Sequence, residues 1–455
     1  MAKIALCRGN LGDVALGGWG MRFAVLTLVT SLYAFGVMAQ TSPDGSSITA
    51  PGSAQLVAQG STWAFGHANP SWAGQYDVVK DGVDIGWSGD AMWVLNAGKL
   101  YMVDSYNTVW LWQPGAGTFV QVPGLPTAPP PPSSTNPPKT ITINVGPGGQ
   151  YAHIADAVGV ANSDGDPRNY YVLNLVPGTY LNDFATVFRP MTIQVDPTFA
   201  PQRAILQATV PLPNQKGIIL TFASLTVRGL EFTGAMIGNG LGGNGAGIRD
   251  QIPDNTPASL VVDNSVFHDN QEGILQCCDA DETVRIVNSQ FKNNGNPDQN
   301  FFQHGIYINQ AAKLEVINSL FCGQLIGHEV KSRAAQTVVT GSQIYTGEGA
   351  PASTGCRVGN ASFNIQVANG GIAMISGNTL VQGPSAQNHK IISYGSEGVS
   401  YVDNSLTVSN NRFFSTAGSI GISDPPCVPV QLDATNTFSG LSAIVDPAGC
   451  SAPTQ

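Results

Sequence analysis

The sequence is poor in charged residues. Only 11% of its 455 residues are charged, and 20 Lys and Arg residues face 30 Asp and Glu residues, which gives a formal net charge of −10. A protein that binds nucleic acid through its phosphates needs a basic stripe, and the sequence contains none. We therefore expect no nucleic-acid partner. An anionic glycan would need locally clustered basic groups or a bound cation.

The sequence also lacks an apolar run long enough to span a membrane. The mainly apolar run Phe23–Met38 has 16 residues, and a spanning helix needs about 20. Met21 and Arg22 precede it and Ala39 follows, a pattern typical of a secretory signal over 21–39, with an uncleaved anchor as the alternative. Residues 1–20 carry no targeting pattern, so we expect a non-native extension there and a translation start at Met21. The mature protein is expected to be secreted (extracellular or periplasmic), free of the membrane after signal cleavage, and monomeric.

Cysteine is scarce, with seven in the chain, of which Cys7 precedes the signal. An even number in an exported chain permits disulfides. The six are Cys277, Cys278, Cys322, Cys356, Cys427 and Cys450. Cys427 and Cys450 could close the C-terminal turn, whereas the vicinal Cys277 and Cys278 are not expected to bond to each other. No C-x-x-C spacing is present, which argues against a zinc site.

A proline-rich stretch over 123–138 divides the mature chain, because proline runs join neither sheets nor helix interiors. Residues 41–122 before it alternate in short segments broken by Gly, Asp and Asn, which predicts a meander of β-hairpins. Six of the seven tryptophans lie there: Trp63, Trp72, Trp87, Trp93, Trp110 and Trp112. Trp110 and Trp112 share a strand face and are candidates for sugar stacking, as in a carbohydrate-binding module. The alternative is that a small sheet needs these rings for its core. The segment resembles small β-modules appended to bacterial secreted proteins and glycan-active enzymes.

Beyond the linker the sequence repeats itself. A β-branched strand, a Gly or Asn, and an apolar anchor recur in seven segments: 224–232, 259–267, 283–291, 313–321, 336–344, 371–380 and 405–413. No unit can bury its apolar face alone, so the units are expected to stack as a solenoid. Strand-only units of this length predict an all-β, right-handed parallel β-helix over 139–455. A propeller would need four strands in each repeat.

The start of this region carries a family resemblance. VGPGGQYAHIADAVGVA (145–161) followed by YYVLNLVPGTY (170–180) resembles the entry of pectin-lyase-like β-helix proteins, in which a short helix caps the first turn. Ile154, Ala157 and Val158 fall at helical spacing, in agreement with such a cap. The resemblance implies the fold but no single reaction, because that fold hosts lyases, hydrolases, esterases, epimerases and non-catalytic adhesins.

A second strand follows each anchor, and its alternation predicts a strip of outward side chains. If the isoleucines and valines of these strands face inward, successive turns place their neighbours about 4.8 Å apart on one exposed face. The expected members are Arg249, Leu275, His304, Tyr307, Asn309, Glu329, Lys331, Arg333, Gln366 and Tyr394. His328 is expected to face inward or to lie at the start of its strand.

Residues 329–332 read E-V-K-S, and Arg357 lies downstream in G-C-R-V-G-N. This pattern weakly resembles the chondroitinase B and alginate lyase family, whose members cleave uronic-acid glycans by β-elimination. The resemblance implies Lys331 as the base, Arg357 as a supporting acid, and Glu329 as a calcium ligand, with Asn309 as a further oxygen donor. Arg333 continues the basic face and is a third catalytic candidate. The sequence departs from the family in having few acidic ligands, a different spacing to the arginine and no R-H-G motif.

The remaining strip residues are then candidate contacts to the glycan, together with two module residues: Arg249, His304, Tyr307, Gln366, Tyr394, Trp110 and Trp112. The expected partner is an extracellular or cell-wall polysaccharide. The rival interpretation is a non-catalytic glycan-binding or adhesin-like protein, with K-S-R as a solvated face on which Glu329 pairs with Lys331. A hydrolase would need paired carboxylates, and Asp279, Asp281 and Glu282 are expected to cap or solvate a turn. A C5-epimerase shares the chemistry of a lyase and is not separable from it by sequence.

Overall fold

The computed structural model describes residues 42, 45–50, 54–72, 75–106, 108–126, 138–238, 244–253, 257–277, 279–298 and 303–446. The expected signal (21–39) and most of the proline-rich stretch lie outside these ranges. Within the ranges, no helix is long and apolar enough to cross a membrane.

The hairpins predicted for 41–122 are present as two small antiparallel sheets, which we call sheets A and B. Sheet A comprises β1 (Ser47–Thr49), β6 (Ala91–Leu95), β7 (Lys99–Val103), β8 (Val109–Gln113) and β9 (Thr118–Val122). Sheet B comprises β2 (Leu56–Ala58), β3 (Ser61–Ala68), β4 (Tyr76–Lys80) and β5 (Val83–Gly89). Trp63, Trp112 and Phe119 meet in their shared core, with ring centroids 4.8–6.2 Å apart.

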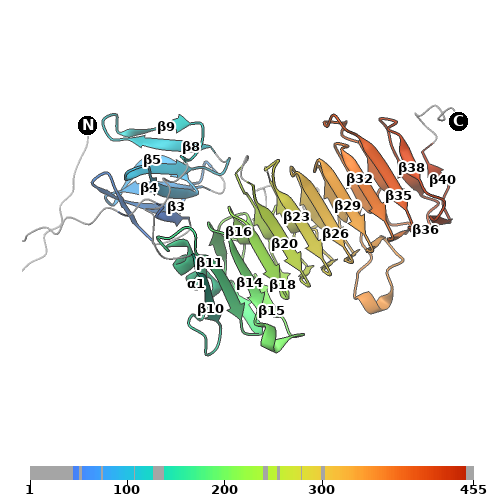
Figure 1. Ribbon diagram of the computed structural model, residues 1–455, viewed down its shortest axis with the longest axis horizontal. Coiled ribbons are helices and arrows are strands. Elements are labelled where there is room, and N and C mark those ends of the chain that lie inside the picture. The colour runs from blue at the N-terminus through green and yellow to red at the C-terminus, as the bar shows by residue number, and fades with distance from the viewer. Residues whose placement is uncertain are drawn as a thin grey trace, which may run out of the picture. The chain divides into compact units, whose positions relative to one another are not determined.

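From residue 140 onward the described chain forms a parallel β-helix, as predicted. After β10, which adds a strand to sheet C alone, each turn contributes one strand to each of three parallel sheets, C, D and E, and Figure 1 shows the turns stacked side by side. Sheet C comprises β10 (Thr140–Val145), β11 (Tyr170–Leu175), β14 (Met191–Val195), β17 (Leu225–Arg228), β20 (Ser259–Asp263), β23 (Thr283–Val287), β26 (Lys313–Ile317), β29 (Gln336–Thr340), β32 (Ile372–Ser376), β35 (Ser405–Ser409) and β38 (Val430–Leu432).

Sheets D and E complete each turn. Sheet D comprises β12 (Gly178–Leu181), β15 (Ala204–Gln207), β18 (Leu230–Thr233), β21 (Val266–His268), β24 (Gln290–Lys292), β27 (Leu320–Cys322), β30 (Gln343–Thr346), β33 (Thr379–Gln382), β36 (Arg412–Ser415) and β39 (Thr437–Ser439). Sheet E comprises β13 (Ala185–Val187), β16 (Gly217–Thr221), β19 (Ala246–Asp250), β22 (Glu272–Gln276), β25 (Ile306–Ile308), β28 (Val330–Ser332), β31 (Ile365–Val367), β34 (Lys390–Tyr394), β37 (Ile420–Ser423) and β40 (Ala443–Val445).

The repeated residues of the sequence explain this coil. The bend from sheet C to sheet D takes a positive φ, which favours Asn and Gly. The chain places them there at Gly229, Asn264, Asn288, Asn318, Gly341, Gly377 and Asn410. The predicted anchors follow in register inside the coil, where Phe232, Phe267, Phe291 and Phe321 stack with centroids 4.7–4.8 Å apart.

The predicted cap at the start of the coil is α1 (Ile154–Asn162). Ile154, Ala157 and Val158 are buried against the first turn. Its first backbone N–H groups donate to the carboxylate of Asp183, at 2.7 Å from Ile154 N and 3.0 Å from Ala155 N. The short 3-10 helices η1 (Pro197–Phe199) and η2 (Ala352–Thr354) lie in loops.

The cysteines that the structure describes are in disulfide bonds. Cys322 in β27 is bonded to Cys356, which anchors the long excursion after β30 to sheet D. Cys277 and Cys427 are also disulfide-bonded. Cys278 and Cys450 lie outside the described residues.

Candidate functional site

The outer face of sheet E carries the predicted strip in part. Parallel pairing aligns Arg249, Leu275, Tyr307, Lys331 and Gln366 on consecutive rungs. Residues at one register position share one face of a parallel sheet. The alternation therefore placed these five residues on the outer face correctly. The expectation that this face is exposed is wrong for three of them, because Leu275 (5% exposed), Lys331 (8%) and Gln366 (4%) are buried.

Tyr394 was expected on this strip, and that expectation is wrong. The pairing of β31 with β34 places Ser393 opposite Gln366 and Tyr394 opposite Val367. Tyr394 is fully buried inside the coil, and its hydroxyl donates to Gly371 O. The sequence K-I-I-S-Y-G-S contains two adjacent isoleucines, so its register could not be read from alternation alone.

Glu329 was also expected to point to solvent, and that is wrong too. It is 1% exposed and lies before β28, at the bend from sheet D. Its Oε1 accepts a hydrogen bond from Gln324 N at 3.2 Å. Burial raises its pKa well above the usual range, since the charged form is desolvated.

The residues proposed for calcium do not fit a calcium site in this arrangement. Glu329 is turned into the bend, whereas the amide oxygen of Asn309 accepts from Arg333 at 2.8 Å and from the Tyr307 hydroxyl at 2.8 Å. Calcium prefers several carboxylate and carbonyl oxygens together. Over the described residues, no group of three or more His, Cys, Asp or Glu is arranged to hold a metal.

The basic residues of K-S-R converge on a carboxylate that sequence reasoning missed. Lys331 Nζ lies 2.7 Å from Glu397 Oε1, and Arg333 Nε lies 3.0 Å from Glu397 Oε2, with a second contact from the same guanidinium. Burial opposes ionisation of Glu397, but hydrogen bonds from Lys331 and Arg333 outweigh it and lower its pKa. Glu397 comes from the loop after β34, in G-S-E-G-V-S, where no strand alternation indicated a position.

Tyr307 completes this cluster on the neighbouring turn. The Lys331 Nζ lies 5.0 Å from the centre of its ring, and the Arg333 guanidinium carbon lies 5.4 Å from it. Both distances fall within the range of cation–π attraction. We call Tyr307, Asn309, Lys331, Arg333 and Glu397 the sheet E cluster.

Gln366 and Arg249 lie on either side of the sheet E cluster along the strip. Gln366 Nε2 donates to Ser396 Oγ at 3.0 Å, beside Glu397. Arg249 is partly exposed on β19, and desolvation lowers its pKa to about 10 despite the nearby Glu272 and Asp250 carboxyl groups. Basic groups of the strip thus lie at Arg249 and, three rungs further along, at Lys331 next to Gln366.

His304 and His328 stack with Phe363 at successive bends into sheet E, with centroids 4.8 Å and 4.9 Å apart. His328 is buried as predicted, but His304 is 2% exposed and does not open the strip. His304 Nδ1 accepts from His328 N at 3.0 Å, which places any proton of the neutral ring on Nε2. Burial lowers the pKa of His304 well below its usual value and that of His328 to about 3.

Arg357 does not join Lys331. It lies on the excursion tethered by Cys356 to sheet D, and its guanidinium pairs with Asp269 at 2.7 Å. Asp269 also contacts His268 Nδ1 at 2.7 Å, and Glu231 contacts His268 Nε2 at 3.1 Å. The structure therefore separates the two residues that the lyase resemblance would combine.

The acidic residues considered for a hydrolase lie at a turn, as expected, and Asp281 is exposed there. Asp279 and Glu282 are fully buried. Asp279 Oδ1 does cap the turn by accepting from Asp281 N at 3.1 Å. Glu282 accepts from Gln276 at 2.8 Å and lies beside Asp250, and burial raises the pKa of both carboxyl groups. Groups without solvent access offer no surface for a glycosidic bond.

The two tryptophans proposed for sugar stacking differ in their surroundings. Trp112 is 5% exposed and packs edge-on against Trp63, so the expectation that it is open to a ligand is wrong. Trp110 is partly exposed, and its indole N–H donates to Asp104 Oδ2 at 3.0 Å. Alternate residues of β8 do share a face, on which Phe119 packs against Trp112 and Trp87 packs against Trp110.

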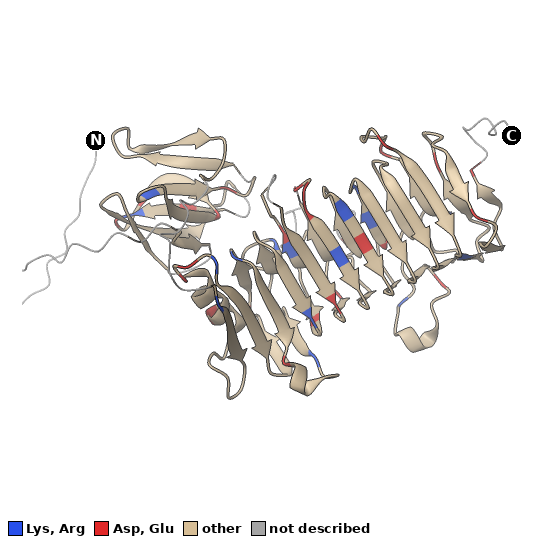
Figure 2. Ribbon diagram, in the orientation of Figure 1, with Lys and Arg blue, Asp and Glu red and all other residues tan. Residues whose placement is uncertain are grey.

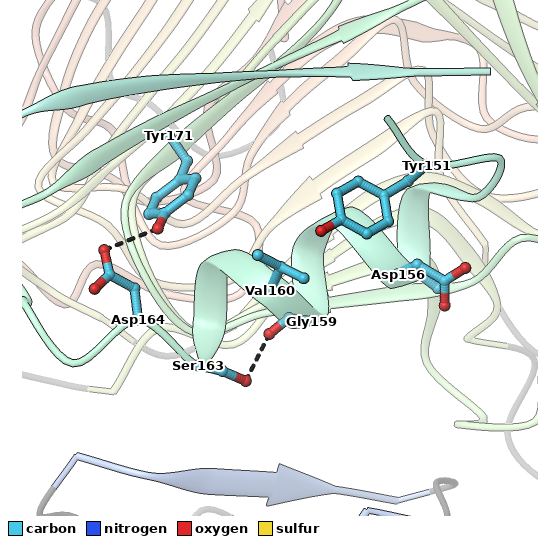
Figure 3. Close-up of a pocket in the computed structure, with 8 residues that line it drawn as sticks. Tyr151, Asp156, Gly159, Val160, Ser163, Asp164 and Tyr171 are labelled. Atoms are coloured by element: carbon cyan, nitrogen blue, oxygen red, sulfur yellow. Dashed lines mark hydrogen bonds between the residues drawn. The ribbon is translucent and has the colours of Figure 1, made fainter. Parts of the chain in front are cut away.

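A hollow of about 870 Å³ lies beside α1 and is lined by Tyr151, Asp156, Val160, Asp164 and Tyr171 (Figure 3). Two polar groups of its lining, Asp164 and Tyr171, are paired with each other. Asp164 Oδ2 accepts from the Tyr171 hydroxyl at 2.8 Å and pairs with Arg189 at 3.3 Å. Burial opposes its ionisation, but these and backbone hydrogen bonds lower its pKa to about 2. We assign this hollow to the capping of the coil.

No protein-family model and no curated protein matches the chain. Among solved structures it is similar to pectate lyase Pel9A, with 12% identity, TM-score 0.38, and 69% of this chain and 82% of that chain covered. It is also similar to the Dettilon tailspike protein (14%, 0.34, 66% and 60%) and to ORF18 of Geobacillus virus E2 (11%, 0.36, 75% and 68%). These similarities are distant and concern the β-helix fold.

Proposed function

We propose that this chain binds an acidic extracellular or cell-wall polysaccharide along the outer face of sheet E. The observation that carries the proposal is the pair Lys331 and Arg333 around Tyr307. Two cations that converge on one carboxylate, beside an aromatic ring and an amide, present the groups that a uronic acid unit would use. Lys and Arg are sparse on the long sheets (Figure 2), so two on one strand segment are notable.

In this proposal, Glu397 occupies the position of the sugar carboxylate when no glycan is bound. It contacts both cations, it belongs to a loop whose residues 396–399 are mostly exposed, and it is itself only partly buried. A glycan carboxylate would replace it by offering the same two acceptor oxygens. The Glu397 side chain would then turn toward solvent, while its backbone stays in place through the hydrogen bond from Glu397 N to Ala368 O at 2.9 Å.

Cleavage by β-elimination needs a base that can accept the C5 proton. A Lys331 ammonium that donates to Glu397 has no lone pair for that purpose, and Arg357 is bound elsewhere. The contacts therefore favour binding over catalysis, with the lyase as the finer hypothesis. Among the residues that the structure describes, no contact supports a hydrolase or a C5-epimerase activity.

Isothermal titration with hexagalacturonate and hexamannuronate tests the proposal. The double variant Lys331→Ala/Arg333→Ala should lose at least about tenfold in affinity, since each contact with a charged group contributes about 1.5 kcal/mol or more. Lys313→Ala is the matched control, because Lys313 is ion-paired to Glu315 on sheet C. Equal affinity of the double variant and wild type would overturn the proposal.

The same mixtures, read by the ultraviolet absorbance of the unsaturated uronates that a lyase would release, separate the two interpretations. A rising signal that Lys331→Ala abolishes would establish a lyase. A flat signal with retained binding would establish a non-catalytic glycan-binding protein.

A further inference from the structure

The antiparallel module contains an aromatic hollow at the edge of its core, and two of the lining rings, Trp87 and Trp110, pack against that core. The volume of the hollow is about 320 Å³, and Trp72, Trp87, Tyr106 and Trp110 line it together with Asp104 and Gln75. Trp72 is 53% exposed and Tyr106 is 72% exposed. Large aromatic residues are costly to leave in water, so two of them beside one hollow need an explanation.

The inner rings of this hollow are held in fixed positions. Trp87 packs edge-on against Trp110, with centroids 5.2 Å apart, and also against Phe119 at 5.2 Å. The Trp110 indole N–H donates to Asp104 Oδ2, while Asp104 Oδ1 accepts from Tyr106 N and Thr108 N, both at 2.9 Å. The aromatic walls are therefore positioned before any ligand arrives.

The polar groups of the hollow are also fixed. Gln75 is 5% exposed, donates to Ser105 Oγ at 3.0 Å and accepts from Ser88 Oγ at 2.9 Å. Asp104 uses three acceptor positions in the contacts above, and a carboxylate has about four. One acceptor position thus remains for a donor from a ligand.

We infer that this hollow binds a neutral pyranose unit of a polysaccharide. Rings that are apolar on their faces stack on the apolar faces of sugars, and the remaining Asp104 acceptor would take a sugar hydroxyl. None of the residues that line the hollow is basic, and Asp104 would repel a uronate. The hollow is thus suited to a different chemistry from the sheet E cluster, and the inference does not depend on the acidic-glycan proposal.

Intrinsic tryptophan fluorescence of the full chain, titrated with cellohexaose, xylohexaose and mannohexaose, tests this inference. At least one neutral hexaose should change the emission and bind. Trp72→Ala and Tyr106→Ala should each weaken that binding by about tenfold, the scale of one lost aromatic contact. Both residues are largely exposed, so the variants should fold.

Phe199→Ala is the matched control, because Phe199 is an exposed ring (37%) on η1, remote in sequence from the hollow. It should bind as wild type does. The inference is overturned if no neutral hexaose binds, or if Trp72→Ala and Tyr106→Ala bind as tightly as Phe199→Ala. Hexagalacturonate should bind equally to wild type and Trp72→Ala, so failure here is distinct from failure at the sheet E cluster.

Discussion

Replacing Glu397 by Gln should make the chain less stable but a better ligand-binding protein. Glu397 contacts Lys331 and Arg333, and its side chain is 33% exposed. Charged hydrogen bonds contribute about 1.5–3 kcal/mol each when buried, and screening by solvent reduces this to about 1 kcal/mol for each partner at such exposure. Removing the carboxylate should therefore lower the free energy of unfolding by about 2 kcal/mol.

The same 2 kcal/mol, approximately, is what a glycan carboxylate must overcome to reach the two cations. In the Glu397→Gln variant this competition disappears, so hexagalacturonate should bind about 30-fold more tightly. Isothermal titration gives the affinity, and urea unfolding monitored by circular dichroism gives the stability. A lower free energy of unfolding together with a higher affinity for hexagalacturonate is the combination expected if the Glu397 carboxylate occupies the binding site.

Glu315→Gln controls for net charge, because Glu315 pairs with Lys313 and Arg285 on sheet C. It changes the total charge by the same amount without touching the sheet E cluster. If Glu397→Gln binds the oligosaccharide no more tightly than Glu315→Gln does, Glu397 is a structural partner of the two cations and our reasoning is refuted.

Three further predictions concern the coil itself. Phe291→Ala, within the aromatic stack, should lower the free energy of unfolding by about 3–5 kcal/mol in urea denaturation, whereas Phe199→Ala should change it by no more than about 0.5 kcal/mol; equal losses would show that the stack is unimportant. Replacing Cys322 and Cys356 by Ser frees a 34-residue separation, and the chain-entropy relation gives a loss of about 4 kcal/mol, to be measured against wild type with and without reductant. The pKa of His268 is raised mainly by its hydrogen bond to Glu231, so its stabilisation should be complete below the unfolded value of about 6.5 and lost as pH rises through the higher folded value. The stability difference between wild type and His268→Gln should therefore be constant well below the unfolded pKa of about 6.5 and shrink as the pH rises above it, and a difference that stays constant over the whole range would contradict this.

The sequence predicted the coil because its signals are local and repeated. Asn or Gly at each bend, and an anchor such as Phe267 or Phe291 shortly after, determine where every turn closes. The face assignment was equally sound where one inward residue alternates with one outward residue, as at Tyr307.

Prediction failed where the partner came from another turn or where alternation breaks. Glu397 lies 64 residues from Arg333, in a loop with no periodic pattern. Glu329 sits at a bend, where the period of two does not apply, so its side chain turns inward. Arg357 was separated from Lys331 by a long excursion whose course is set by a covalent link, which spacing alone does not reveal.

The in-register stacking has a consequence for how such a chain can change its length. Because the strands of consecutive turns pair in register, deleting a whole turn would bring two strands of the same register together. Side chains that face the core would still face the core, and outward side chains would still face outward. The effect of the deletion on the sheet E cluster would depend on the turn. Lys331 lies on β28 and Glu397 follows β34, two rungs further along. Excision of the turn through β22 would leave that spacing intact, whereas excision of the turn through β31 would bring the carboxylate one rung closer, about 4.8 Å. The number of turns between Lys331 and Glu397 thus sets the distance between them along the coil.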